Sequence, residues 1–365
     1  MSKLCYCTNV HPAEDLPGIL EQLDRYSLPV RHQLGADRLG LGLWLAAGVA
    51  EGLAADPAAV RRFRGELDAR GLDVLTLNAF PYGGFHRERV RHDVYRPAWT
   101  EQARVRYTAN CATVLAGLLA DDARAGSIST LPLGWRTPWT AADDASAAAG
   151  LTEAARACAA AGERAGRPIR LAVEPEPGCV LDTVADAVDW LAGRVDPELV
   201  GICLDTCHLA VSWADPSATV ASIADAGLRV AKVQASAALE VPDPMDPAVR
   251  DALAEFAEGR YLHQVRERSV GGADDLADAL GGTLPGRAPW RVHFHVPLHA
   301  RPRAPLRATT EVIETVLGDL DQDVPVEVET YTWSVLPRAH REPLVPGIAA
   351  ELAWAGARLS AAVPR

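Results

Sequence analysis

Four short apolar runs in the second half of the chain end in side chains that could bind a metal ion or move a proton. These residues are, in chain order, Glu174 and Glu176, Asp205 and His208, Gln234 and Ser236, and Glu327 and Glu329. Carboxylates that converge on one place repel one another unless a cation or a shared proton compensates. Oxygen-rich clusters with an imidazole suit Mg²⁺, Mn²⁺ or Co²⁺, and Zn²⁺ is also compatible. The pattern predicts a divalent metal site if the four ends meet.

A single acidic residue at the end of a strand has a simpler interpretation, as a helix N-cap or a solvated charge. That interpretation weakens when consecutive strands share the feature. Side chains alternate along a strand, so Glu327 and Glu329 point the same way. The position at the strand exit is the better candidate, which favours Glu174 in one run and Glu329 in the other.

Two further segments carry residues suited to a binding site. The run H-F-H-V-P-L-H places His293 and His295 on one face if it is extended, and H-x-H is a common metal-ligand spacing. An exposed edge segment is the alternative. The run N-A-F-P-Y-G-G-F-H, which begins at Asn78, has a composition that suits a substrate-facing loop. Packing of its own aromatic side chains is the structural alternative.

The elements that must position these residues alternate along the chain. Eight β-rich runs are separated by segments with helical spacing, which favours a (β/α)₈ TIM barrel, an α/β fold. We expect residues 1–365 to form this barrel as a single domain. The predicted strands are 4–10, 38–45, 72–78, 127–133, 169–175, 200–206, 228–234 and 324–330. In such a barrel the active site lies at the C-terminal ends of the strands. A doubly wound sheet is the rival, but no G-x-G-x-x-G follows the first strand.

A ninth strand-like run at 290–299 does not fit eight strands. Residues 241–289 are rich in Pro, Gly and Asp and precede it. We therefore predict an insertion over 241–299, between the seventh and eighth strands.

Composition restricts the partners. The chain has 365 residues and a formal charge of −12, which repels the phosphate backbone of nucleic acids. No window approaches the roughly 20 apolar residues that a membrane span needs, so no membrane insertion is expected. The N-terminal residues do not resemble a signal peptide, and seven irregularly spaced cysteines fit reduced thiols. These features predict a cytoplasmic protein; homo-oligomer formation is left open.

The motifs at the late strands resemble those of the xylose-isomerase-like barrel superfamily. They are E-P in the fifth run, L-D-T-x-H in the sixth, V-x-A-S in the seventh and Glu in the eighth. That superfamily includes sugar epimerases, inosose isomerases and dehydratases, and endonuclease IV enzymes. More narrowly, the chain resembles the EboE (metabolite traffic protein) family in C-Y-C-T-N-V-H-P-A-E, N-A-F-P-Y-G-G-F-H, G-S-I-S-T-L-P-L-G, L-D-T-C-H and V-E-V-E-T-Y-T-W-S-V-L-P. These stretches span almost the full length.

The resemblance implies roles for individual residues. Glu174, Asp205 and Glu329 match metal-binding carboxylates, and His208 matches a substrate- or metal-binding histidine. Family enzymes usually place a metal-ligating histidine where this chain has Gln234. A glutamine carbonyl is a weaker ligand than imidazole for transition metals. Three explanations are open: the metal is a harder cation or is bound more weakly, His293 or His295 replaces the missing histidine ligand, or the site has lost its metal.

These inferences predict a metal-dependent isomerase or epimerase that acts on a small polyol, sugar or cyclitol. Glu174 and Glu329 are the expected proton-transfer pair. The predicted metal ligands are Glu174, Asp205, Gln234 and Glu329, and the predicted substrate contacts are Asn78, His208, His295 and Trp333. The alternatives are a non-catalytic metabolite-binding or traffic protein on the same barrel, and an endonuclease-IV-like hydrolase. The latter requires extra histidines at the second and third strands, which end in Leu-Trp and Leu-Asn.

Overall fold

The centre of the molecule is a closed barrel of eight parallel strands. The computed structural model describes residues 3–321 and 323–362. Around the barrel the strands follow the order β1-β2-β3-β4-β5-β6-β7-β13, and β13 closes onto β1. Their bounds are β1 (Leu4–Cys7), β2 (Leu39–Trp44), β3 (Leu72–Asn78), β4 (Gly126–Thr130), β5 (Ile169–Val173), β6 (Val200–Asp205), β7 (Val230–Ala235) and β13 (Val326–Val328). The predicted (β/α)₈ barrel is confirmed.

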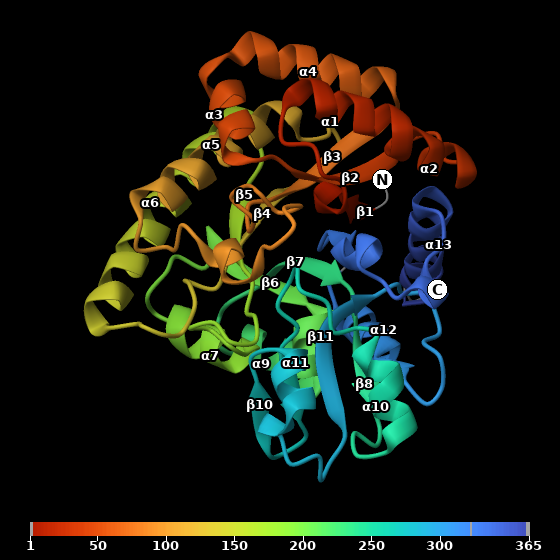
Figure 1. Ribbon diagram of the computed structural model, residues 1–365. Helices are drawn as coiled ribbons and strands as arrows, with labels where there is room; N and C mark the ends of the chain where they lie inside the picture. The colour runs from red at the N-terminus through yellow and green to blue at the C-terminus, as the bar shows by residue number, and fades with distance from the viewer. Residues whose placement is uncertain (1–2, 322, 363–365) are drawn as a thin grey trace.

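Helices surround this barrel (Figure 1). They are α1 (Leu16–Gln22), α2 (Leu28–Gln33), α3 (Ala47–Ala55), α4 (Pro57–Ala69), α5 (Gln102–Leu118), α6 (Ala141–Ala165), α7 (Val184–Leu191), α8 (Thr206–Val211), α9 (Pro216–Asp225), α12 (Thr310–Asp319) and α13 (Leu344–Ala362). Local sequence fixes where several helices begin. Thr140 and Thr183 form capping boxes, and the Asp56 side chain accepts a hydrogen bond from the Ala58 backbone N–H at the start of α4, whose first residue is Pro57. Among the described residues, no helix is long and apolar enough to cross a membrane.

A second sheet lies between β7 and β13 in the chain. Its five strands follow the order β10-β9-β11-β8-β12, and all neighbours are antiparallel. Their bounds are β8 (Ala237–Val241), β9 (Val265–Glu267), β10 (Gly271–Ala273), β11 (Trp290–Val296) and β12 (Arg307–Ala308), with α10 (Pro247–Ala254) and α11 (Leu276–Asp278) between them. The sheet therefore extends beyond the predicted range of 241–299 on both sides, and the run at 290–299 is one of its strands.

The second sheet has its own hydrophobic core, which explains why it folds as a unit beside the barrel (Figure 1). Trp290, Val292 and Phe294 of β11 are fully buried in this core. The pairing of β11 with β8 shifts register between Val292 and Val296. Phe294 points into the core, and the histidines on either side of it line the cavity at the barrel mouth.

A buried ion pair fills the barrel below its mouth. Lys232 of β7 and Glu327 of β13 are fully inaccessible, with Nζ 2.8 Å from Oε1. Lys232 also donates to Ser129 Oγ at 3.1 Å, and Thr76 Oγ1 donates to Glu327 Oε2. Space for this carboxylate comes from Gly42 of β2, where a Cβ atom would lie 1.7 Å from Glu327 Oε2.

Candidate active site at the barrel mouth

The predicted metal-binding carboxylates meet at the C-terminal ends of the strands. Glu174 follows β5, Asp205 is the last residue of β6, and Glu329 follows β13. One carboxylate oxygen from each lies within 4.8 Å of the other two. All three residues are at most 4% exposed. The parallel barrel thus gathers three buried acids from separate parts of the chain, as the sequence predicted.

Amide groups hold two of these carboxylates in place. The Gln234 amide nitrogen donates to Glu174 Oε1 at 3.2 Å and also to Glu329 Oε2. Asn9 and Asn78 each donate to Glu329 Oε1, at 2.7 and 3.0 Å. Asn78, predicted as a substrate contact, therefore lines the cavity and also orients Glu329.

Asp205 has two roles that the sequence analysis treated as alternatives. Its Oδ1 atom caps α8 by accepting from the His208 backbone N–H at 2.8 Å, and it also accepts from Ser236 Oγ at 2.9 Å. Its Oδ2 atom has no hydrogen-bond partner. One oxygen therefore fixes the backbone, and the other is directed to the site.

The charges of this cluster are poorly balanced by the protein. Burial, followed by repulsion from Glu329 and Asp205, raises the pKa of Glu174 well above its usual value. Burial, followed by repulsion from Asp205 and Glu327, raises the pKa of Glu329 to about 8. Buried charges are costly without a partner, so the cluster favours either a bound cation or retained protons.

Unpaired atoms show that the residues fit a divalent cation. Glu174 Oε2, Asp205 Oδ2 and His295 Nε2 are buried, and none of the described residues gives them a hydrogen bond. His295 Nδ1 lies 2.8 Å from the Glu329 carbonyl oxygen, which can only accept, so Nδ1 carries the proton and Nε2 has a free lone pair. That nitrogen lies 3.9 Å from Asp205 Oδ2. Three carboxylates and an imidazole form a ligand set suited to such an ion.

Gln234 and His295 differ in how they face this site. Gln234 directs its amide nitrogen, which is a donor, toward two carboxylates, and its Oε1 atom is unpaired. As a metal ligand it would have to present Oε1, so its ligation stays a prediction. His295, from the second sheet, already presents a lone pair, and it is the better placed nitrogen donor.

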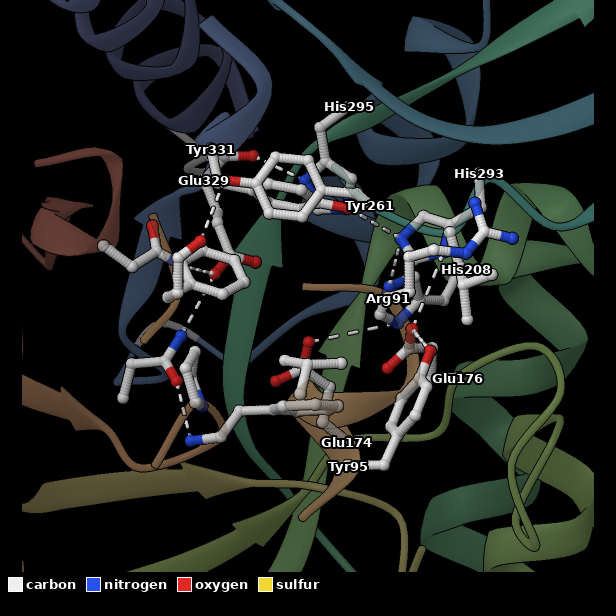
Figure 2. A pocket seen from close by; sticks show the side chains of 17 residues that line it. Arg91, Tyr95, Glu174, Glu176, His208, Tyr261, His293, His295, Glu329 and Tyr331 are labelled. Carbon is white, nitrogen blue, oxygen red and sulfur yellow. Dashed lines mark hydrogen bonds and ion pairs between the residues drawn. The ribbon is translucent and has the colours of Figure 1, made fainter. Parts of the chain in front are cut away.

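A narrow cavity with about 50 Å³ of free space lies above the carboxylates. Barrel loops and the second sheet form its walls together (Figure 2). The lining residues include Phe80, Phe85, Arg91, Tyr95, Glu176, His208, Tyr261, His293, His295 and Tyr331. The predicted contacts Asn78, His208 and His295 are among them.

Trp333, the fourth predicted substrate contact, is placed apart from the cavity. Its indole N–H donates to Glu351 Oε2 at 3.3 Å, and its ring packs against Gly347 of α13. Residues Tyr331–Ser334 form a 3₁₀ turn, in which residues two apart do not share a face as they would in a strand. Tyr331 lines the cavity instead.

Several cavity residues were missed by the sequence analysis. Arg91 and Tyr95 belong to the short 3₁₀ helix Arg91–Tyr95, and Tyr261 lies in a loop. Nothing in their local sequence marks them. Asn9 follows the first strand within the C-Y-C-T-N-V run, which carried the resemblance but was given no role. Its position at a strand exit was the available signal.

Carboxylates at the C-terminal mouth of a closed parallel barrel define the architecture on which TIM-barrel active sites are built. The family described as xylose isomerase-like TIM barrel matches residues 33–262, and the chain belongs to this family. No curated protein sequence matches the chain.

Solved structures show the same fold at low sequence identity. An L-ribulose 3-epimerase is 14% identical, with a TM-score of 0.57 over 99% of this chain and 96% of that one. A putative sugar phosphate isomerase/epimerase from Anabaena variabilis is 15% identical, with a TM-score of 0.55 over 100% of both chains. A xylose isomerase-like protein from Mycobacterium smegmatis, in complex with magnesium, is 13% identical, with a TM-score of 0.56 over 99% and 97%.

Proposed function

We propose that the protein is a divalent-metal-dependent isomerase or epimerase of a small hydroxyketone of the sugar or cyclitol type. The observation that carries this proposal is the convergence of three buried carboxylates, two of which, Glu174 and Asp205, each have one oxygen without a partner among the described residues. The family and the fold shared with sugar epimerases support the reaction class.

The proposed ion is held by Glu174, Asp205 and Glu329, with His295 as the nitrogen ligand and Gln234 as the alternative. When bound, such an ion polarises a carbonyl group, stabilises developing negative charge and so acidifies the adjacent C–H bond. His295 then replaces the histidine that family enzymes usually carry on the seventh strand.

Glu174 and Glu329 are the proposed proton-transfer pair. A general base works best when its pKa lies near the operating pH, and burial raises the pKa of Glu329 to about 8 before any ion binds. The Gln234 amide lies between the two carboxylates and orients both. Return of the proton on the same face gives isomerisation, and return on the opposite face gives epimerisation.

The walls of the cavity suit a small polyol. His208 and Asn78 offer polar contacts, and the aromatic rings of Tyr261 and Tyr331, 4.9 Å apart, form an apolar surface beside them. Both histidines of β11 and Tyr261, from the loop before β9, lie on one wall, so the site is covered from that side (Figure 2). Enclosure keeps water from the reacting carbon.

The test is a panel of ketoses and inososes incubated in D₂O with the metal-loaded protein. We expect conversion with deuterium at the carbon beside the carbonyl, because the carboxylate exchanges its proton with solvent. Glu174→Gln and Glu329→Gln keep the shape but remove the base, so each should lower the rate about 10²–10⁴-fold. Glu153→Gln, on the exposed face of α6, is the matched control and should not change the rate.

A non-catalytic metabolite-binding protein, of the kind that the EboE resemblance suggests, is the second candidate. Gln234 favours it, since this amide occupies the place of the usual histidine and already joins Glu174 to Glu329. Tight binding of a sugar or inosose with neither conversion nor exchange would establish this candidate and reject the enzyme.

A further inference from the structure

A second group of ligand atoms lies on the side of the cavity next to the second sheet. Glu176, His208 and His293 each present one such atom, and all three atoms lie within 4.8 Å of one another. The residues are at most 7% exposed. None of them belongs to the set Glu174, Asp205 and Glu329. The two imidazoles meet with their Nε2 atoms 3.0 Å apart (Figure 2).

The hydrogen bond on the far side of His208 fixes its tautomer. Nδ1 lies 2.8 Å from the carbonyl oxygen of Pro175, which follows β5. A carbonyl oxygen can only accept, so Nδ1 carries the proton. In the neutral ring, Nε2 therefore presents a lone pair toward His293.

A chain of hydrogen bonds fixes the tautomer of His293 as well. Tyr95 donates its hydroxyl to Glu176 Oε1 at 2.6 Å. The Tyr95 oxygen must then accept from the Gln264 amide nitrogen at 3.0 Å. This orientation turns Gln264 Oε1 toward His293 Nδ1, 2.6 Å away, so Nδ1 carries the proton. Nε2 of His293 also presents a lone pair.

With both Nδ1 atoms protonated, the two Nε2 atoms, 3.0 Å apart, need either a shared proton or a cation between them. The Tyr331 hydroxyl, 3.5 Å from His293 Nε2, is too far for a good hydrogen bond. Two nitrogen ligands at about 2.1 Å from one tetrahedral ion are about 3.4 Å apart, so a small movement of the rings would admit the ion. The ring planes cross at 86°.

We propose that Glu176, His208 and His293 bind a second divalent cation, separate from the ion held by Glu174, Asp205 and Glu329. Two imidazoles and one carboxylate favour Zn²⁺, Co²⁺ or Fe²⁺, whereas the three-carboxylate set favours Mg²⁺ or Mn²⁺. Three protein ligands leave a coordination position for an oxygen of a bound small molecule, such as a polyol hydroxyl. The second site does not depend on the reaction proposed above, because the ion would bind whatever the chemistry.

The test counts ions on the full-length protein. The chain is stripped with a chelator, dialysed against Co²⁺, and analysed for cobalt per chain. We expect two ions for the wild type and one for His293→Gln or Glu176→Gln. Asp205→Asn should also retain one ion, at the second site. Cobalt bound to the two imidazoles should absorb visible light in Asp205→Asn but not in His293→Gln.

His299→Gln is the matched control, since His299 lies three residues beyond β11 and is paired with Glu342 outside the cavity. It should bind two ions. Circular dichroism and thermal unfolding check that each variant is folded. If His293→Gln does not fold, the number of cobalt ions per chain is taken from Glu176→Gln. One ion in the wild type, or two in both folded His293→Gln and Glu176→Gln, would overturn the proposal and leave a shared proton between the imidazoles. These counts are independent of the isomerase assay.

Discussion

Two layers of buried polar side chains occupy the same two strands and differ in how their charges are compensated. Lys232 and Glu327 form the lower layer, and Gln234 and Glu329, two residues further along, belong to the upper one. In the lower layer the ammonium and the carboxylate pair with each other and with neighbouring hydroxyl groups. In the upper layer the carboxylates face one another, and two of their oxygens have no partner in the part of the chain that the structure describes.

The difference separates a structural polar group from a candidate functional one. Buried polar atoms in folded proteins are almost always paired, as they are in the lower layer. The unpaired atoms of the upper layer lower stability unless something else binds there. A site for a ligand can therefore be recognised by what the protein leaves uncompensated, even where the residue types in two layers are alike.

The largest expected effect comes from breaking the lower layer. Lys232→Met should leave Glu327 as an uncompensated buried carboxylate and lower the free energy of unfolding by about 3–5 kcal/mol. Urea denaturation of the metal-free protein measures this loss. The double variant Lys232→Met with Glu327→Gln should recover most of the loss, because no buried charge remains. A single-variant loss below about 1 kcal/mol would show that the lower layer is not the structural charge pair described above.

An intermediate effect is expected from pH in the upper layer. The pKa of Glu329 is raised from 4.5 to about 8 in the folded protein, so the folded state retains a proton that the unfolded chain releases. The associated stability is complete below about pH 4.5 and is lost as the pH rises to about 8. One such proton contributes a slope of at most about 1.4 kcal/mol per pH unit.

Unfolding of the chelator-treated protein between pH 5 and 8 measures this slope. Glu329→Gln should make it shallower, and excess Mn²⁺ should oppose it, since the ion favours the ionised carboxylates. An equal slope in Glu329→Gln and the wild type would contradict this explanation of the upper layer.

The smallest expected effect comes from Ser129→Ala in the lower layer. The change removes one hydroxyl that accepts from Lys232 and leaves the ion pair with Glu327 in place. A hydrogen bond to a charged group contributes about 1.5–3 kcal/mol, and the remaining partners should keep the loss near the lower value. Denaturant unfolding gives the loss, and metal titration should be unchanged. A weakened metal site would mean that the two layers are coupled.

The barrel could be predicted because each of its strands is a compact apolar run followed by a helical segment. The second sheet could not, apart from β11, because its other strands have two to five residues and no clear periodicity. Its strands are held by pairing with β11 and by a shared core, which are contacts between distant parts of the chain. No local pattern encodes them.

The carboxylates were predictable for a related reason: parallel strands bring their exits to one end of the barrel whatever lies between them. The hydrogen-bonded chain from Tyr95 through Gln264 to His293 was not, since it joins a 3₁₀ helix, the residue before β9 and strand β11 of the second sheet. Trp333 was predicted as a substrate contact, but the structure places it apart from the cavity. In the 3₁₀ turn after β13 its indole N–H donates to Glu351.

Gly42 links the lower layer to the evolution of the sequence. A side chain at this position would overlap the Glu327 carboxylate, so the glycine and the acid can only be retained together. Among homologues, we expect sequences that keep Lys at position 232 and Glu at 327 to keep Gly at 42. Sequences with a larger residue at 42 should have replaced both charges. This covariation would trace the ion pair through the lineage independently of any residue at the mouth.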